Sequence, residues 1–412
     1  MPEPRSADGP LAGLNVVDCS TVLAGPFCSM LLGDLGADVV KVEPPEGDAT
    51  RGWGPPWVGD EAAGTRTAAY YLAVNRNKRS LRLDLKAEAG KAVLRRLLQR
   101  GDVLVENFRV GALARLGFDD DALTALNPGL VHLAISGYGR SGLEASKPGY
   151  DFVIQAEGGL MSITGEADAF GGRALKVGVA ISDVVSGLFG AVSVLASLVG
   201  RERGPTPGEG QRIDVSLLES TLAILINQAQ NAFVSGRSPG RRGNAHPNIV
   251  PYETFRTSDG EIAVGVGSER QWPRFCEAIG LPELTEDPRF RSNGDRVDHR
   301  EALIPLISAQ LAMRSSAEWL TVLDAADVPN GPILDVLGAF DSPAARARGA
   351  RVPLTHPVLG EVDQVAPPFE LSRTPASIRR PPPLLGEQSA EILTELGYTA
   401  RQIERLQTDA VV

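Results

Sequence analysis

The first third of the chain alternates short apolar runs with amphipathic stretches, a pattern that predicts strands alternating with helices. The predicted strands cover residues 14–18, 38–42, 80–85, 102–106 and 130–136. A turn with Gly25-Pro26 is predicted after the first strand, followed by a helix that runs to Leu35, and further helices are predicted over 87–99 and 119–126. This alternation implies right-handed crossovers and a largely parallel sheet, whose ligands bind beyond the carboxyl ends of the strands. Those ends lie at Cys19-Ser20, Glu106-Asn107-Phe108 and Ser136-Gly137-Tyr138.

The pattern changes in the second half of the chain. Residues 180–199 are rich in small residues and predict a helix, and 212–233 predict a short strand followed by one long helix. Alternation around Ser258-Asp259-Gly260 predicts a hairpin over 252–266, and helices are predicted over 270–279, 299–313 and 317–326. Short strands and prolines follow, with a last helix near 389–396.

Two breaks in composition suggest the domain boundaries. Residues 201–211 form a connector of Gly, Pro and charged residues, and Asn330-Gly331-Pro332 marks a second break. We therefore expect a large domain of residues 1–200 and 335–412, a small α+β domain of 225–330, and linkers at 201–224 and 331–334. With 412 residues and 43% hydrophobic content, the chain is long enough for two such domains.

Charge and cysteine content narrow the function classes. A net charge of −10 disfavours a general surface for nucleic acid or anionic membrane. Three cysteines argue against a disulfide framework, and the four histidines are not spaced as metal ligands, so no metal is expected. The N-terminus lacks the apolar core of a signal peptide, and no uninterrupted apolar run reaches about 18 residues. These features predict a soluble cytoplasmic protein that binds no nucleic acid and no membrane.

Two basic segments are candidates for phosphate binding. Residues 75–79 carry three cations in four positions, and residues 106–118 supply an amide, an aromatic ring and two guanidinium groups. Guanidinium forks match phosphate oxygens, so two such segments on successive βα units favour a polyphosphorylated small ligand. The alternatives are a solvated basic turn at 75–79 and a helix start that leaves Arg109 and Arg115 facing solvent.

The first βα turn, residues 20–26, lacks the GxGxxG pattern that brings backbone close to a dinucleotide pyrophosphate, which disfavours a nicotinamide enzyme. A different candidate is Asp168, a carboxylate on a turn-rich segment that follows an apolar run. Such a carboxylate is able to attack an activated acyl group as a covalent nucleophile. The alternative is a solvated loop aspartate.

The ordered motifs of this chain resemble those of the class III coenzyme A transferases, a family that also includes carnitine-type CoA transferases and α-methylacyl-CoA racemases. Matching segments include Pro148-Gly149-Tyr150-Asp151 and Gly243-Asn244-Ala245-His246-Pro247. Others are residues 11–18, 32–43, 75–80, 105–109, 136–139 and 385–387, so that the resemblance covers nearly the whole chain.

The resemblance implies an α/β fold in an interlocked homodimer, with a Rossmann-like large domain built from both chain ends and a smaller α+β domain. It also implies that Asp168 is the covalent nucleophile and that coenzyme A, as a substrate, contacts a defined set of positions. The contacts carried over are Arg79, Leu83, Asn107, Phe108, Arg115 and Tyr138.

Three positions depart from the best-known members. The small-domain loop at 240–246 replaces the glycine run of the oxalate-specific transferase, so oxalate is not inferred. The arginine that contacts CoA phosphate in that enzyme is replaced near Pro44-Pro45. Gln388 stands where relatives often have histidine.

Three functions are compatible with the resemblance. A transferase would form an acyl-aspartyl anhydride at Asp168 and then pass CoA between an acyl-CoA and a carboxylic acid. A racemase needs an acid and a base on opposite faces of the α-carbon. Asp183 matches one of them, but Tyr150 replaces the family's histidine, and an unperturbed phenol is a poor replacement for an imidazole in this role. A non-catalytic CoA-binding protein would need no Asp168. We favour the transferase; Arg173, Arg241 and Arg242 suggest a dicarboxylate or else only a solvated loop.

Overall fold

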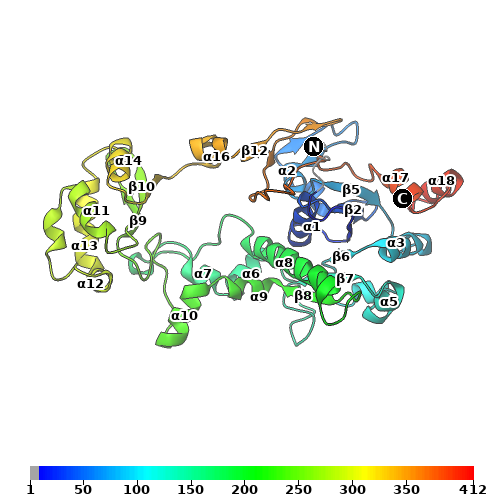
Figure 1. Ribbon diagram of the computed structural model, residues 1–412, viewed down its shortest axis with the longest axis horizontal. Coiled ribbons are helices and arrows are strands. Elements are labelled where there is room, and N and C mark those ends of the chain that lie inside the picture. Colours follow the sequence, from blue (N-terminus) through cyan, green and yellow to red (C-terminus); the bar gives the residue numbers. More distant parts are fainter. Residues whose placement is uncertain (1–8) are drawn as a thin grey trace. The chain divides into compact units, whose positions relative to one another are not determined.

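The structure is a computed structural model that describes residues 9–412. The chain forms two compact units (Figure 1). The larger unit comprises the described residues up to Leu160, together with Val177–Gln230 and Ala344–Val412. The smaller unit comprises Met161–Lys176 and Asn231–Pro343. Asp168 therefore belongs to the smaller unit, although it lies between two segments of the larger one in sequence.

The larger unit is built on a six-stranded sheet in which every neighbouring pair is parallel. Its strands are β1 (Asn15–Asp18), β2 (Asp38–Glu43), β5 (Lys78–Arg82), β6 (Val103–Glu106), β7 (Val131–Ser136) and β8 (Arg212–Ser216). They lie in the order β5-β2-β1-β6-β7-β8. The predicted parallel sheet is confirmed, and the chain reverses its direction of winding between β1 and β6, as in doubly wound nucleotide-binding folds.

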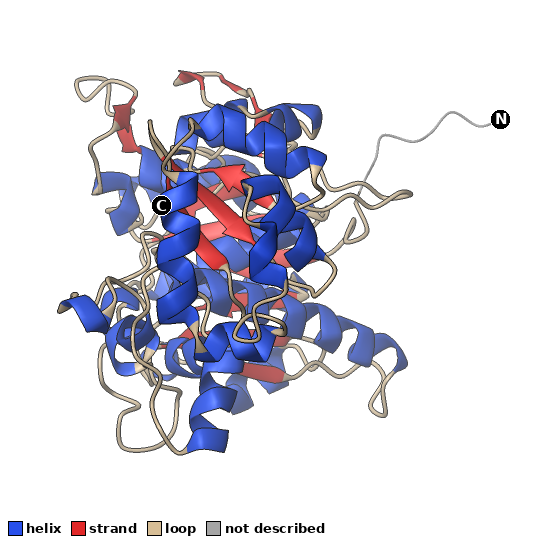
Figure 2. Ribbon diagram, turned by 90° about the vertical axis from the view of Figure 1, so that its left-hand side faces the viewer, coloured by secondary structure: helices blue, strands red, loops and turns tan. Residues whose placement is uncertain are grey.

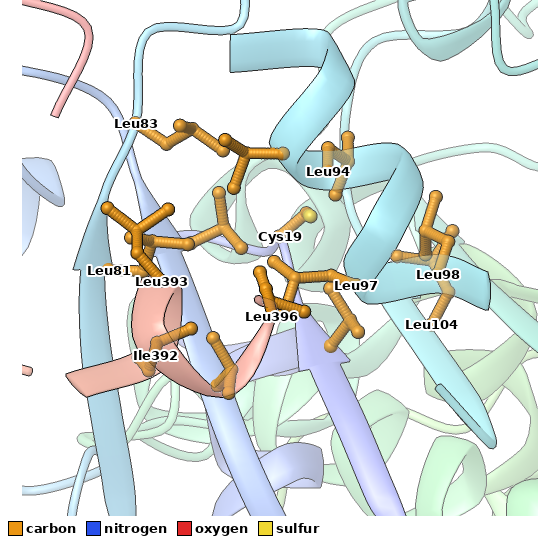
Figure 3. Packing of buried hydrophobic residues seen from close by; sticks show 14 of the residues in the cluster. Cys19, Leu81, Leu83, Leu94, Leu97, Leu98, Leu104, Ile392, Leu393 and Leu396 are labelled. Carbon is orange, nitrogen blue, oxygen red and sulfur yellow. The ribbon is translucent and has the colours of Figure 1, made fainter. Parts of the chain in front are cut away.

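Alternate residues of each strand face opposite sides of this sheet, and each side has its own apolar core. On one side Val17, Val40 and Leu81 pack with α3 (Glu88–Arg100), α17 (Ser389–Glu395) and α18 (Ala400–Thr408). Figure 3 shows the side chains of this cluster. On the other side Val16 and Val39 pack with α1 (Ala24–Asp34) and α8 (Ile181–Arg203). Figure 2 distinguishes the helices (blue) from the strands (red) of the described residues.

Helix α8 is long and apolar enough, by length and composition alone, to cross a membrane. Its buried positions, however, pack against α1 and β7, where Gly187 and Gly190 leave no room for a side chain beside Ala24 and Leu133. A central helix of a two-layered core has the same composition. The observed packing accounts for the apolar character of the buried part of α8.

Buried ion pairs lie at the carboxyl end of β1. Asp18 accepts hydrogen bonds from Lys78 (3.0 Å) and Ser29 (2.5 Å), and Lys41 is paired with Asp48 at 3.0 Å. Burial alone would raise the pKa of the Asp18 carboxyl, but Lys78 and Lys41 hold it below its usual range. Burial lowers the pKa of Lys78 to about 8.

The smaller unit has an antiparallel sheet in the order β11-β10-β9, formed by β9 (Tyr252–Arg256), β10 (Glu261–Gly265) and β11 (Asn330–Pro332). Pairing of β9 with β10 confirms the predicted hairpin. Helices α11 (Gln271–Ile279), α13 (Arg300–Leu311) and α14 (Ser316–Ala325) lie where helices were predicted. Their apolar faces meet the sheet in a separate core that contains Phe275 and Trp319.

Two predictions about helices were wrong. The long helix predicted after a short strand within 212–233 is two helices, α9 (Leu217–Ala223) and α10 (Ile226–Ser235), because Ile226 has a φ of 42° and interrupts the regular backbone. Helix α18 was not predicted; Thr399 and Gln402 form a capping box at its start.

The remaining elements are short. The helices are η1 (Ala49–Gly52), α2 (Ala69–Leu72), α4 (Ala112–Arg115), α5 (Asp120–Leu126), α6 (Asp151–Glu157), α7 (Leu160–Ile163), η2 (Asp168–Phe170), η3 (Pro282–Thr285), α12 (Asn293–Asp298), α15 (Val336–Asp341) and α16 (Pro343–Ala347). The strands are β3 (Trp57–Val58), β4 (Thr67–Ala68), β12 (Arg351–Val352), β13 (Thr355–His356), β14 (Gly360–Glu361) and β15 (Gln364–Val365).

Candidate functional site

A cavity of about 330 Å³ lies at the carboxyl ends of β1, β6 and β7. This is the place where a doubly wound sheet binds its ligand. The loop after β1 contributes Thr21 and Val22, and the loop after β6 contributes residues 107–110. Ser136, the last residue of β7, and Gly137 after it complete this part of the wall. The wall also includes Lys147, Tyr150 and Asp183. All these residues belong to the larger unit.

Asn107 joins two of the loops that line this cavity. Its side-chain carbonyl accepts a hydrogen bond from the Thr21 N–H at 2.9 Å, and its amide donates to the Thr21 carbonyl at 2.7 Å. The buried Glu106 carboxylate accepts from the Phe108 N–H at 2.7 Å and from Arg140 at 2.5 Å. These bonds fix the rim of the cavity. The role of Asn107 in this structure is to hold the loop after β1 and the loop after β6 together.

Two cations line the cavity. Arg109 is exposed, and Lys147 is paired with Glu157 at 2.8 Å while its ammonium group lies 4.5 Å from the centre of the Tyr138 ring. The hydrogen bond that Lys147 donates to the Glu157 carboxylate raises the pKa of Lys147. Both cations are able to meet a phosphate group. Lys147 was not among the predicted contacts, although it immediately precedes the Pro148-Gly149 motif.

Asp183 contributes an unusual carboxyl group to the same cavity. Burial, and then the charge of Asp151, raise its pKa to about 7. Asp151 itself is fixed by hydrogen bonds from the Ser182 N–H and from Gln155, both at 2.8 Å. Asp183 therefore exchanges its proton near neutral pH, beside the exposed phenol of Tyr150.

Asp168 lies on η2 in the smaller unit, and Arg241 holds it from the facing loop. One carboxylate oxygen accepts from the Arg241 N–H at 2.8 Å, and the other is ion-paired with the Arg241 guanidinium group. The Asp168 N–H in turn donates to the Arg241 carbonyl at 3.1 Å. A Cβ at Gly240 would lie 2.7 Å from the carboxylate, so glycine is needed there for this close approach.

Arg241 also binds the backbone around Asp168. Its guanidinium group donates to the carbonyls of Gly172 (3.1 Å) and Glu166 (3.3 Å). The Asp168 side chain remains 47% exposed. The result is an oriented carboxylate with one side open, which is the arrangement a nucleophile requires.

Of the six predicted CoA contacts, Asn107 and Phe108 line the cavity, and the other four do not. Leu83 is buried in the apolar core, Arg115 is exposed on α4, and Tyr138 lies under Lys147. Arg79 is ion-paired with Asp38 (2.5 Å), Glu391 (2.9 Å) and Glu395 (2.9 Å).

The whole segment from Asn75 to Arg79 is buried, so the alternative prediction of a solvated basic turn was wrong. Its cations neutralise carboxylates on neighbouring elements, such as Asp34, which pairs with Arg76 at 2.6 Å. Within residues 9–412 there is no group of three or more His, Cys, Asp or Glu side chains suited to hold a metal ion.

Comparisons with known proteins agree with this architecture. The family model described as CoA-transferase family III matches residues 11–389. A succinate–glutarate CoA-transferase of Agrobacterium fabrum is 42% identical and aligns over 94% of this chain and 96% of its own length. The human succinyl-CoA:glutarate CoA-transferase is 38% identical over 98% of this chain and 90% of its own. A crystal structure of a CaiB/BaiF family protein from Brucella suis superposes with a TM-score of 0.82 at 40% identity, covering 94% of this chain and all of that one. The chain therefore belongs to CoA-transferase family III and is an enzyme of that family.

Proposed function

We propose that this transferase moves CoA between an acyl-CoA and a carboxylic acid through a covalent anhydride at Asp168. The observation that carries the proposal is the Asp168 carboxylate itself. It is oriented by the Arg241 N–H and guanidinium group, packed against Gly240, and still half exposed. The names of the relatives support CoA transfer; the covalent step rests on this geometry.

The proposed reaction proceeds in balanced steps. An Asp168 oxygen attacks the thioester carbonyl, a C–O bond forms, the C–S bond breaks, and CoA leaves as the thiolate. The acceptor carboxylate then attacks the acyl-aspartyl anhydride and displaces the first acid, leaving the second acid joined to Asp168. CoA thiolate finally attacks that acyl group and frees Asp168. Backbone N–H groups of residues 240–243 are candidates to stabilise the oxyanion, whereas those of Gly171 and Gly172 already donate to the carbonyls of Asp168 and Ala167.

CoA is proposed to bind at the cavity beyond β1, β6 and β7. Phe108 offers an aromatic face, and Arg109 and Lys147 offer cations for phosphate. Arg79, Leu83, Arg115 and Tyr138 stay predictions carried over from the family. For Arg79, a phosphate contact would require the guanidinium group to exchange one of its three carboxylate partners.

The acids are proposed to be dicarboxylic. Relatives from several organisms are named for succinate, glutarate, oxalate or mesaconate as partners in CoA transfer. In this chain Arg173 lies shortly after the candidate nucleophile in sequence, and Arg241, the neighbour of Arg242, is ion-paired with Asp168. A cationic loop is suited to an acid that carries a second carboxylate.

Substitution of Asp168 tests the covalent step. Asp168→Ala and Asp168→Asn should abolish transfer, because neither side chain is able to form the anhydride, while CoA affinity stays unchanged. With acyl-CoA and hydroxylamine, the wild-type enzyme should acquire a hydroxamate on the peptide that contains Asp168, detected by mass spectrometry. Glu166→Gln is the matched control, an exposed carboxylate on the same loop. Full transferase activity in Asp168→Ala would refute the proposal.

One observation favours a second activity, racemisation. Asp183, with its pKa of about 7, lines the cavity together with Tyr150 and so offers a proton-exchanging group there. Incubation of a 2-methylacyl-CoA in deuterium oxide distinguishes the functions: a racemase exchanges the α-hydrogen, depends on Asp183 and does not need Asp168. A CoA-binding protein without catalysis would show neither exchange nor transfer.

A further inference from the structure

The Arg241 guanidinium group contacts one charged partner, a carboxylate, and two neutral partners, both backbone carbonyls. Its guanidinium group is ion-paired with Asp168 and donates to the carbonyl oxygens of Glu166 and Gly172. Its side chain is 19% exposed. Among the hydrogen bonds and ion pairs of the described residues, Asp168 is the one carboxylate that neutralises this guanidinium group.

The covalent step proposed above changes this balance of charge. When Asp168 becomes part of an anhydride, its carboxylate charge is lost and reappears on the sulfur of the departing CoA. Arg241 then keeps its two carbonyl contacts but has no anion. A partly buried cation without a partner is costly, and a guanidinium group in this state attracts any carboxylate within reach.

A dicarboxylic acyl group brings such a carboxylate with it. The acyl chain is joined to an Asp168 oxygen, which is already in contact with Arg241, so a second carboxylate a few bonds away lies within the length of the arginine side chain. A monocarboxylic acyl group of the same length places a methyl group there and leaves the cation unpaired. The exchange of partners thus favours one substrate class.

Resting on the function proposed above, we propose that Arg241 exchanges Asp168 for the distal carboxylate of a dicarboxylic acyl group when the anhydride forms. Arg241 is then the residue that selects dicarboxylic over monocarboxylic acyl-CoA substrates. In the free enzyme the same guanidinium group orients the nucleophile.

The test compares succinyl-CoA with butyryl-CoA, which has the same chain length but lacks the distal carboxylate. Hydroxamate formation at Asp168 and the kcat/KM of CoA transfer are measured for each donor. The wild-type enzyme should prefer succinyl-CoA. In Arg241→Ala, the kcat/KM for succinyl-CoA should fall by a factor about tenfold or more larger than the factor for butyryl-CoA, as expected for a lost charge-assisted bond. Arg241→Lys, which keeps the charge, should retain part of the preference.

Arg237→Ala is the matched control, because Arg237 is an exposed arginine of the same unit that lies outside the loop at 240–246; this variant should leave the preference unchanged. Equal losses for both donors in Arg241→Ala would overturn the inference and assign Arg241 only to the orientation of Asp168. The same holds if the wild-type enzyme does not discriminate between the donors. Transfer that proceeds without any hydroxamate at Asp168 would instead overturn the underlying mechanism. Thermal melting of each variant confirms that it folds.

Discussion

Asp183 is a carboxyl group whose ionisation opposes folding. Its folded pKa of about 7 exceeds the usual value of 3.8, because the partly buried side chain is poorly solvated and the charge of Asp151 opposes its ionisation. A carboxyl whose pKa is raised in the folded state lowers the free energy of unfolding as the pH increases from about 4 to about 7. In this range the unfolded chain has released the proton and the folded chain still holds it. The penalty is complete above pH 7.

We therefore expect Asp183→Asn to increase the free energy of unfolding at pH 8, by about 2 kcal/mol more than at pH 5. Urea unfolding at the two pH values measures the difference. Glu404→Gln, at an exposed position of α18, is the control and should leave the pH dependence unchanged. If Asp183→Asn has the same effect at pH 5 and pH 8, the raised pKa is wrong.

The residues of the site were predictable to different degrees. Asn107 and Phe108 follow β6 directly, so the position of a strand end placed them in the cavity. Lys147 was not identified, because it lies on a loop well after the end of β7, and the sequence pattern does not reveal that this loop folds back to the cavity. The link between Arg241 and Asp168 joins residues 73 positions apart, and the sequence suggested only a cluster of positive charge.

Polar contacts hold α17, the second-last helix of the chain, against β5. Arg79 bonds Glu391 and Glu395 on the helix, and the Gln388 side chain accepts from the Ser80 N–H at 2.8 Å. Gln388, where relatives often have histidine, thus has a structural contact in this chain. The Arg79 side chain is only 7% exposed, and its ion pairs join a carboxylate of β2, Asp38, to the two carboxylates of α17.

We expect Arg79→Met to lower the free energy of unfolding by about 2 kcal/mol, since it leaves Asp38, Glu391 and Glu395 without their shared cation. Chemical denaturation measures this loss. Arg405→Met, which breaks an exposed pair with Asp409 on α18, should change stability by less than about 0.5 kcal/mol. Titration with CoA separately tests the family-based contact; unchanged stability would mean that the ion pairs of Arg79 do not fasten α17.

At the level of elements, periodicity was sufficient where one side of an element is buried. The strands of the parallel sheet and helices α3, α11, α13 and α14 lie close to their predicted positions. The pattern failed where it could not report backbone geometry, as at Ile226 between α9 and α10. It also failed at the basic segment from Asn75 to Arg79, because composition does not reveal that carboxylates from distant elements neutralise buried cations.

For the whole molecule, the notable surface feature is the number of exposed large apolar side chains. They include Phe233 and Val234 on α10, Val336 and Leu337 on α15, and Phe189 and Val192 on α8. Single exposed apolar side chains are common on soluble proteins, but here several are neighbours on the same helix, which is typical of a surface that a partner covers. We propose that a second copy of the chain covers them in an interlocked homodimer, as the resemblance to the family implies.

An interlocked dimer makes a prediction that an ordinary dimer does not. Two chains threaded through each other separate only when they unfold, so dilution should not release a folded monomer. Light scattering should give twice the chain mass of 43.6 kDa, and the dimer should persist when the protein is diluted to nanomolar concentration and held there for hours. The denaturation midpoint should rise with protein concentration, because unfolding and dissociation are coupled. Reversible dissociation to folded monomers would rule out interlocking while allowing a dimer, and a monomer at micromolar concentration would leave the exposed apolar surface to another partner.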